Sequence, residues 1–454
     1  MPILKPPLPW SPRALAAAAA CIAGAAAVPT QSSDRPFALA HVTVVDVAHA
    51  TERADMTVVV ARGRIVSVAP SAEARPGAEV RVVDAAGKYL IPGLWDMHVH
   101  LGVATEPVLP VLVAAGITSV RDMGTRLDQV RAWRRAIDAG RLLGPRIVAA
   151  GAIIDGPGHP SPEKVVAGDA ARARALVDSL ADEGADFIKV YEFLSPEAYA
   201  AIVREAAARR LAVVGHVPRD VGPVAAADAG QRSIEHLSGV PLPCPASARF
   251  LSHVAGGVMP PCGDDRARAD AFAHFRRDGT WVVPTLVKFR GLAAGASAPT
   301  DPRVPAALRA RWAEQVARWP RFVPESYRRM LPKLYEPTAA AAHRAGVPFL
   351  AGSDLGNMNV VPGAGLHDEL TLLVGAGLTP AEALRAATRD AAFFLGAADS
   401  LGTVEQGKLA DLVLLDADPL ADIANVRRIA AVISRGRLLE RRELEAMVER
   451  VAGR

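Results

Sequence analysis

Short apolar runs recur along the middle of the chain, and each is followed by an Ala- and Arg-rich stretch of helical character. Runs of this kind are typical of strands buried on both faces, and their alternation with helices indicates βαβ units in a parallel sheet. Eight such units predict an α/β fold of the (β/α)8 TIM barrel type. The runs lie at residues 89–94, 117–120, 146–150, 186–190, 211–214, 233–235, 281–284 and 348–351. A doubly wound open sheet would show the same periodicity, but no Gly-x-Gly-x-x-Gly follows the first strand to favour it.

Two β-rich stretches flank this region. Residues 37–45, 56–60 and 64–68 show short β-branched runs, and the same texture returns at 402–416 and 429–433. We therefore expect a small β-sandwich domain built from both chain ends. The predicted organisation is an export signal at 1–33, the β-sandwich domain at 34–90 plus 400–440, the barrel at 91–399 and a C-terminal tail at 441–454. The long connection before the eighth run predicts extra helices that form a lid or a substrate wall.

The first 33 residues predict an export signal. Lys5 and Arg13 precede an apolar run at 14–28, and Ala25 and Ala27 offer a small-x-small cleavage pattern. A buried N-terminal helix and a retained membrane anchor are the alternatives. Cys21 follows Ala18-Ala19-Ala20 and weakly matches a lipoprotein site, so a lipid anchor there is a further alternative. The expected location is periplasmic or secreted, with a membrane-anchored lipoprotein as the second choice.

Composition and charge exclude several classes of protein. The chain is 50% hydrophobic and 22% charged, which supports a large core and excludes disorder. The net charge is +4 without a Lys/Arg cluster beside aromatic residues, so no nucleic-acid partner is expected. Cys244 and Cys262 follow the expected signal, and a disulfide and two free thiols both stay open. A small-molecule substrate is the expected partner, and a homo-oligomer is an open alternative.

Ionisable residues recur at the carboxyl ends of the predicted strands, where the active sites of such barrels form. His98 and His100 are alternate residues, so both imidazoles face the same side of a strand. A single histidine is more often structural, but a repeated choice of the same strand end indicates a common polar focus. Zn²⁺ and similar metals favour such a mixture of nitrogen and oxygen ligands. The further members of this set are Lys189, His216, His236 and Asp354.

Lys189 is unusual because it lies inside an apolar run of a chain that has few lysines. Burial disfavours the ammonium and lowers the pKa of a lysine, so a fraction of it becomes a neutral amine. A neutral amine can take up carbon dioxide and form a carbamate, an anionic oxygen ligand able to bridge two metals. The alternative is a buried ion pair, for instance with Glu192 or Asp354.

The ordered set of motifs resembles the metal-dependent amidohydrolase superfamily, in the branch close to imidazolonepropionase-like proteins and metal-dependent dipeptidases. The resemblance runs from about Phe37 to Arg437 and rests on residues 91–100, 188–191, 215–216, 235–236, 352–354 and 407–413. It implies two divalent metal ions, with zinc the expected element. His98, His100, Lys189 as a carbamate and Asp354 would hold one ion, and Lys189, His216 and His236 the other. Asp354 would also act as general base while a metal-bound hydroxide attacks the substrate.

The expected function is therefore that of an exported binuclear metal-dependent hydrolase acting on a carbon–nitrogen bond, amide or dipeptide-like. Hydrolysis of a lactone, carbamate or phosphoester at the same site is the alternative within catalysis. A metal-holding binding protein without turnover is the alternative from another class. Dipeptidase relatives often carry an aromatic residue soon after the fifth-strand histidine, where this chain has Val217-Pro218-Arg219, and this departure counts against a dipeptide as the substrate. The candidate substrate-binding residues are His159, Tyr191, Arg219 and Asn357, although His159 also suits an exposed loop and Arg219 a surface charge.

Overall fold

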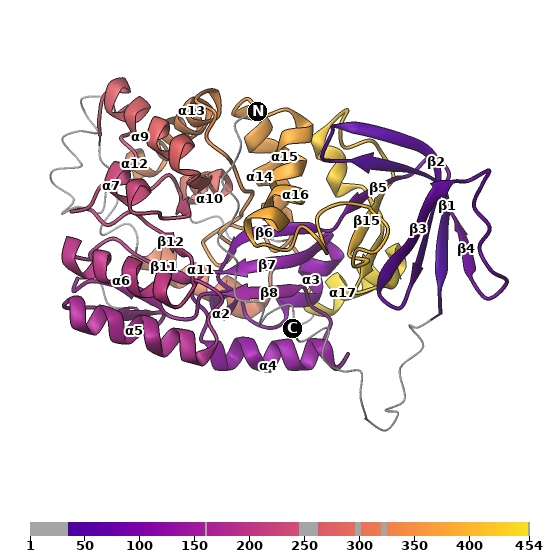
Figure 1. The fold of residues 1–454 in the computed structure, drawn as a ribbon, viewed down its shortest axis with the longest axis horizontal. Helices are drawn as coiled ribbons and strands as arrows, with labels where there is room; N and C mark the ends of the chain where they lie inside the picture. Colours follow the sequence, from indigo (N-terminus) through magenta and orange to yellow (C-terminus); the bar gives the residue numbers. More distant parts are fainter. Residues whose placement is uncertain (1–34, 159–160, 245–261, 296–300, 319–324, 453–454) are drawn as a thin grey trace.

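The computed structural model describes residues 35–158, 161–244, 262–295, 301–318 and 325–452. The expected export signal, including Cys21, and His159 lie outside the described residues. A β-sheet lies at one end of the molecule, and the helices gather around shorter strands elsewhere (Figure 1). No helix in the described ranges is both long and apolar enough to cross a bilayer.

The sheet at this end is built from both ends of the chain. β1 pairs antiparallel with β2 and parallel with β5, and β5 in turn pairs with the C-terminal β15. Eight strands form one hydrogen-bonded sheet at this end of the molecule. The arrangement of this domain as a sandwich of two packed layers remains a prediction. The path runs β17 (Arg437–Glu440), β16 (Ile429–Ser434), β15 (Leu412–Leu415), β5 (Tyr89–Pro92), β1 (Phe37–Asp46), β2 (Thr51–Ala61) and β3 (Arg64–Pro70), with β4 (Arg81–Asp84) beside β1.

The run expected as one strand at 89–94 is two strands, so that prediction was wrong. β5 belongs to the terminal sheet, whereas β6 (Leu94–Val99) begins the first group of parallel strands. Gly93 separates them, and a Cβ there would lie 2.1 Å from Thr118 Oγ1 of β7 (Ile117–Asp122). Apolarity alone could not reveal the break, because both strands are buried.

The parallel strands fall into two groups. β6 and β7 continue to β8 (Arg146–Ala149), and the second group runs β10 (Lys164–Val166), β9 (Ile153–Asp155), β11 (Ile188–Val190), β12 (Val213–Gly215), β13 (Ser233–Glu235) and β14 (Trp281–Val283). The eighth expected run, 348–351, makes an isolated bridge at Phe349 instead of a strand. Leu350 N donates to Val282 O and Met97 N to Ala351 O, each at 2.9 Å, so this segment lies between β14 and β6.

Helices follow most of these strands, with starts and stops that the sequence encodes. The Asp169 side chain accepts a hydrogen bond from Arg172 N at the start of α5, and Gly184 ends that helix with φ of 91°. The bounds are α2 (Leu101–Ala104), α3 (Val108–Ala114), α4 (Leu127–Asp138), α5 (Ala170–Glu183), α6 (Pro196–Ala208), α7 (Pro223–Asp228), α9 (Asp265–Asp278), α10 (Leu286–Ala294), α11 (Ala306–Arg318), α12 (Glu325–Arg328), α13 (Leu331–Arg344), α14 (Ala364–Gly375), α15 (Pro380–Ala386), α16 (Arg389–Phe394), η2 (Ile423–Arg427) and α17 (Arg441–Ala452).

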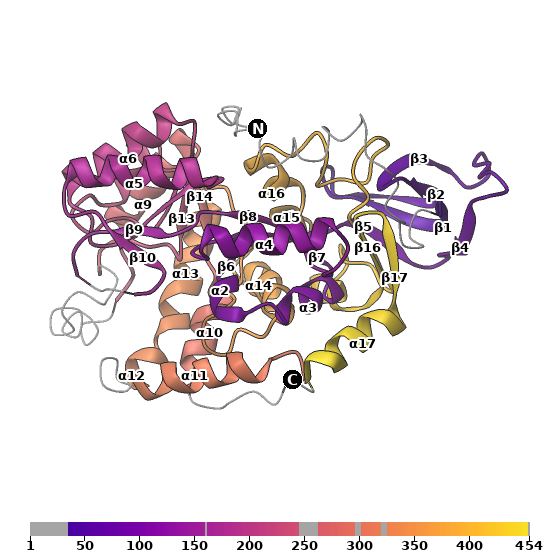
Figure 2. The same ribbon diagram turned by 90° about the horizontal axis from the view of Figure 1, so that it is seen from below.

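Two expectations about the connections can be compared with the structure. Extra helices are present between the seventh and eighth runs, as α10 to α13. The expected C-terminal tail contains α17, which lies beside α3 (Figure 2). Leu444 and Met447 of α17 belong to the same hydrophobic cluster as Val113 of α3. The sequence left open whether Cys244 and Cys262 are bonded or free. In the structure they form a disulfide with a Cα–Cα distance of 5.4 Å. This disulfide links the end of the stretch after β13 to the residues just before α9.

Candidate metal centre

Four histidines from three separate parts of the chain come together at the strand ends. His98 lies in β6 and His100 directly after it, while His216 and His236 directly follow β12 and β13. The ring centroids of His98 and His236 are 4.6 Å apart, those of His98 and His100 5.4 Å, and those of His216 and His236 4.9 Å. The fold therefore gathers the imidazoles that the sequence singled out.

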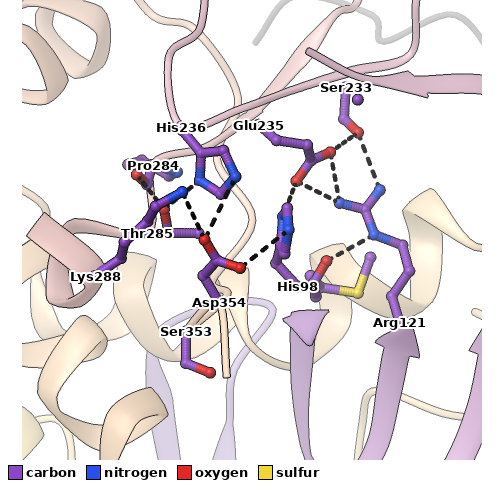
Figure 3. Close-up of polar contacts among 12 residues, drawn as sticks. His98, Arg121, Ser233, Glu235, His236, Pro284, Thr285, Lys288, Ser353 and Asp354 are labelled. Atoms are coloured by element: carbon purple, nitrogen blue, oxygen red, sulfur yellow. Dashed lines mark hydrogen bonds and ion pairs between the residues drawn. The ribbon is translucent and has the colours of Figure 1, made fainter. Parts of the chain in front are cut away.

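Asp354 lies among these rings. Its Oδ1 is 3.4 Å from Nε2 of His98 and 3.5 Å from Nε2 of His100, and its Oδ2 is 3.5 Å from Nε2 of His236. The carboxylate faces both His98 and His236 in Figure 3. Asp354 N also donates to His98 O at 2.8 Å, which ties the two segments together through the backbone.

The backbone is strained at three positions of this centre. His236, Thr285 and Asp354 have φ values of 60°, 50° and 59°, in the left-handed region that residues with a side chain rarely adopt. Each such residue costs on the order of 1–3 kcal/mol, and such strain gathers at functional sites. Gly352 allows the close approach of this segment to β6, since a Cβ there would lie 2.8 Å from His98 N.

Each imidazole faces an oxygen through its Nδ1 atom. Three of these contacts are hydrogen bonds, from His98 to Glu235 Oε2 at 2.8 Å, from His236 to Thr285 Oγ1 at 2.6 Å and from His216 to Glu192 Oε1 at 3.0 Å. His100 Nδ1 lies farther from its oxygen, 3.5 Å from Glu163 Oε2. A carboxylate at Nδ1 favours the tautomer that carries its proton there and leaves the Nε2 lone pair free. Histidines that bind metals are commonly oriented in this way.

Glu235 is itself held by a buried guanidinium. Arg121 Nη2 lies 2.8 and 2.9 Å from the two Glu235 carboxylate oxygens, and Ser233 Oγ donates to Oε1 at 2.5 Å (Figure 3). Arg121 Nε donates to Met97 O at 2.7 Å. The side chains of Arg121 and Glu235 are both 0% exposed. The ion pair therefore fixes Glu235, and through it the ring of His98.

Burial sets the protonation of the centre. It lowers the pKa of His98, His216 and His236, which favours the neutral imidazole that metals bind. Burial also lowers the pKa of Lys189 to about 8, which increases its neutral fraction. For Asp354, burial alone would raise the pKa, but the Lys288 ammonium, 2.8 Å from Oδ2, holds it below its ordinary value, so the carboxylate stays ionised.

A cavity of about 300 Å³ opens beside the centre. Lys189, His216 and Asp354 line it together with His100 and His236, so five of the six predicted ligands share one space. The expected substrate-binding residues Tyr191 and Asn357 line it as well. Arg219 instead pairs with Glu192 at 2.7 Å and lies over the Phe193 ring, so its guanidinium supports a partner of His216.

Several residues of this site escaped the sequence analysis. Glu163 lies between β9 and β10, where no strand was expected. Lys288 lies in the first turn of α10 and places Nζ 2.8 Å from Asp354 Oδ2. Arg121 and Thr285 act on histidines more than 20 positions away in the chain, so no local motif could reveal them. Glu235 had a signal, because it directly precedes His236.

The residues present fit a divalent cation. Nε2 of His98 and Oδ1 of Asp354 are buried, and neither makes a hydrogen bond within the described part of the chain. Buried polar atoms without partners are costly and call for an explanation. His98, His100 and Asp354 offer ligand atoms that all lie within 4.8 Å of one another. Imidazole nitrogen and carboxylate oxygen suit zinc and related metals.

An α/β fold with a histidine and carboxylate focus at its strand ends defines the class of metal-dependent hydrolases. The chain belongs to the amidohydrolase family, whose model matches residues 89–439. The family resemblance and the enzyme class predicted from the motifs are thereby confirmed. This membership supports a hydrolase and does not support the alternative of a metal-holding protein without turnover.

Three similar proteins show how far the likeness extends. Ochratoxinase of Aspergillus niger is 25% identical over 397 residues, 74% of this chain and 71% of that protein. Imidazolonepropionase of Thermoplasma volcanium is 39% identical over 88 residues, 19% of this chain and 21% of that protein. A solved structure from Bifidobacterium longum, provisionally assigned as a prolidase, is 29% identical with a TM-score of 0.71 and covers 92% of this chain and 99% of that one.

Proposed function

We propose that this protein is an exported binuclear metal-dependent hydrolase that cleaves a carbon–nitrogen bond in a small amide or dipeptide-like substrate. The observation that carries the proposal is that His98 and Asp354 lie beside the cavity-lining candidate ligands. His98 Nε2 and Asp354 Oδ1 face each other there without hydrogen-bond partners in the described part of the chain. The amide bond is the choice because similar proteins include an ochratoxinase and a protein assigned as a prolidase.

The proposed ligand sets are those that the sequence suggested. His98, His100, Asp354 and a carbamate on Lys189 would hold one ion, and the same carbamate with His216 and His236 the other, with zinc the proposed element. When bound, such a pair of cations makes water more acidic and polarises the carbonyl to be attacked. The pKa of about 8 for Lys189 supports the carbamate, because its neutral amine is accessible near neutral pH.

The chain's own residues supply proton handling and orientation. Asp354 is the proposed general base, and it stays ionised because the Lys288 ammonium lies beside it. Glu235, Glu192 and Thr285 hold the histidine rings through Nδ1, so little reorganisation is needed during the reaction. Tyr191, whose ring stacks on His216 at 4.0 Å, and Asn357 form part of the proposed substrate wall.

The architecture is proposed to be a closed (β/α)8 barrel beside a small β-sandwich domain, with the boundaries expected from the sequence. The hydrogen bonds that place residues 348–351 between β14 and β6 support one half of the closure. Asp186 N donates to Ala149 O at 2.9 Å, which supports a junction between β8 and β11 at the other.

Export to the periplasm or the medium is proposed from residues 1–33. The Cys244–Cys262 disulfide supports it, because such bonds persist in oxidising compartments. Mass spectrometry of the N-terminus in the native host tests this part. Cleavage after the apolar run is expected, a lipidated Cys21 would mean anchoring, and an intact Met1 on cytosolic protein would contradict export.

Activity is tested on metal-stripped protein reloaded with Zn²⁺ or Mn²⁺ and assayed against N-acyl amino acids, dipeptides, lactones and aryl esters. We expect hydrolysis of amides, and a loss of about 10²–10⁴-fold in Asp354→Asn, as for a general base. Asp228→Asn, at an exposed carboxylate of α7, is the control and should keep full activity. Exclusive turnover of lactones or esters would favour the second function, and no turnover of any probe would contradict the proposal.

A further inference from the structure

The wall of the active-site cavity carries three lysines with different surroundings. Lys189 is buried within β11 and belongs to the proposed ligand set. Lys164 pairs with Asp155 at 2.9 Å and lies 4.0 Å from the Tyr191 ring centroid, so its ammonium is already engaged. Lys288 is 17% exposed and directs its ammonium to Asp354.

Two sets of contacts fix the backbone immediately before Lys288. Thr285 precedes α10 and has a left-handed backbone conformation. Its Oγ1 accepts a hydrogen bond from His236 Nδ1 at 2.6 Å and donates one to Pro284 O at 2.8 Å. Val287 N donates to the buried carboxylate of Glu369 at 2.8 Å. Figure 3 shows the lysine reaching from this fixed point toward Asp354. Its ammonium is therefore presented at a defined place in the cavity, beside the proposed base.

We propose that Lys288 is a specificity-determining residue that binds a carboxylate of the substrate close to the scissile bond. This inference rests on the proposed function, because Asp354 is there a metal ligand whose charge is shared with the cations. An ammonium in a small, partly buried cavity then needs another anionic partner, since an unpaired charge in such a place is costly. The substrate class is thereby narrowed to amides that carry a free carboxylate, such as N-acyl amino acids or dipeptides.

A simpler role for Lys288 would be to serve Asp354 alone, by keeping that carboxylate ionised. Loss of the lysine would then reduce the turnover of every substrate by the same factor. A carboxylate-binding lysine makes a different prediction, because substrates with a free carboxylate should suffer more than their neutral amides. The ratio of the two specificity constants separates the roles, since any uniform loss cancels in it.

The test uses the metal-loaded enzyme and pairs of dipeptides with a free or an amidated C-terminus. In Lys288→Met we expect the acid-to-amide ratio of kcat/KM to fall about 10- to 100-fold, the range of a hydrogen bond between charged groups. The loss should lie mainly in the KM of the acid. Lys288→Arg should recover most of it, and Lys333→Met, which removes an exposed lysine of α13, should leave the ratio unchanged. Metal content and Tm of every variant are measured alongside.

An unchanged ratio in Lys288→Met, or a wild-type enzyme that does not favour the acid, would overturn the inference while amide hydrolysis itself still stood. If the wild type hydrolyses no amide, the proposed function fails, and calorimetry with free leucine and leucinamide decides about Lys288. At least about tenfold weaker binding of leucine to Lys288→Met, without an equal loss for leucinamide, would support the inference. Equal losses, or no binding of leucine to the wild type, would overturn it.

Discussion

The two histidines of β6 and its end are held in contrasting ways. His98 meets Glu235 at 2.8 Å, and Glu235 meets Arg121, with all of these side chains 0% exposed. His100 faces Glu163 at 3.5 Å, with the two side chains 12% and 27% exposed. The Nδ1 side of His98 is thus closed and paired through Glu235 to Arg121, whereas the His100 side opens to the cavity and is loosely paired. We infer that the first side fixes the metal centre and that the second meets the substrate.

The contrast should appear most strongly in folding stability. Glu235→Ala leaves the buried Arg121 unpaired, which should cost about 3–5 kcal/mol in the free energy of unfolding. Glu163→Ala removes a partly exposed partner and should cost less than about 1 kcal/mol. Urea unfolding of the metal-free proteins measures both.

A matched control separates the charge from the shape of the buried pair. Arg121→Met combined with Glu235→Met removes both charges and should recover most of the stability lost in Glu235→Ala, because buried ion pairs can be replaced by apolar residues at little cost. Equal destabilisation by Glu235→Ala and Glu163→Ala would contradict the contrast between the two sides.

Lys189 combines features of the two sides, because it lines the cavity but is about as buried as His98. Its pKa is lowered to about 8 by burial, against about 10.4 in an unfolded chain. Between these values the unfolded chain binds more protons, so the stability of the metal-free protein should rise with pH, in total by on the order of 3 kcal/mol. Lys189→Met should lack this rise. Unfolding curves in carbonate-free buffer from about pH 7 to about pH 11 test it, and parallel pH profiles would refute it.

Metal affinity offers the smallest of these effects. Glu235→Gln keeps the size of the side chain but weakens the acceptor of His98 Nδ1, and the loss of such a partner typically costs about 10–100-fold in affinity. Glu163→Gln should change affinity by less than about tenfold, since its contact with His100 is long. Competition with a chromophoric chelator measures both. A larger loss in Glu163→Gln than in Glu235→Gln would reverse the assignment of the two sides.

The sequence revealed the candidate ligands but not the residues that support them, for a physical reason. His98, His216 and Asp354 are visible because a polar residue at the end of an apolar run is a local anomaly. Arg121 and Lys288 reach the centre through contacts between distant segments, which no local pattern contains. The same limit explains the fold: burial patterns located most strands, but the break at Gly93 depends on packing against Thr118.

The central claim is that the six predicted residues hold two cations with a carbamate on Lys189, and metal stoichiometry tests it most directly. Wild-type protein and Lys189→Ala are stripped of metal and carbon dioxide, reloaded with Zn²⁺ with or without bicarbonate, and submitted to elemental analysis. We predict about two equivalents in the wild type with bicarbonate. Fewer should bind without bicarbonate, and Lys189→Ala should bind fewer in both cases unless a short carboxylic acid fills the vacated position. Two equivalents in both proteins, with or without bicarbonate, would contradict the account.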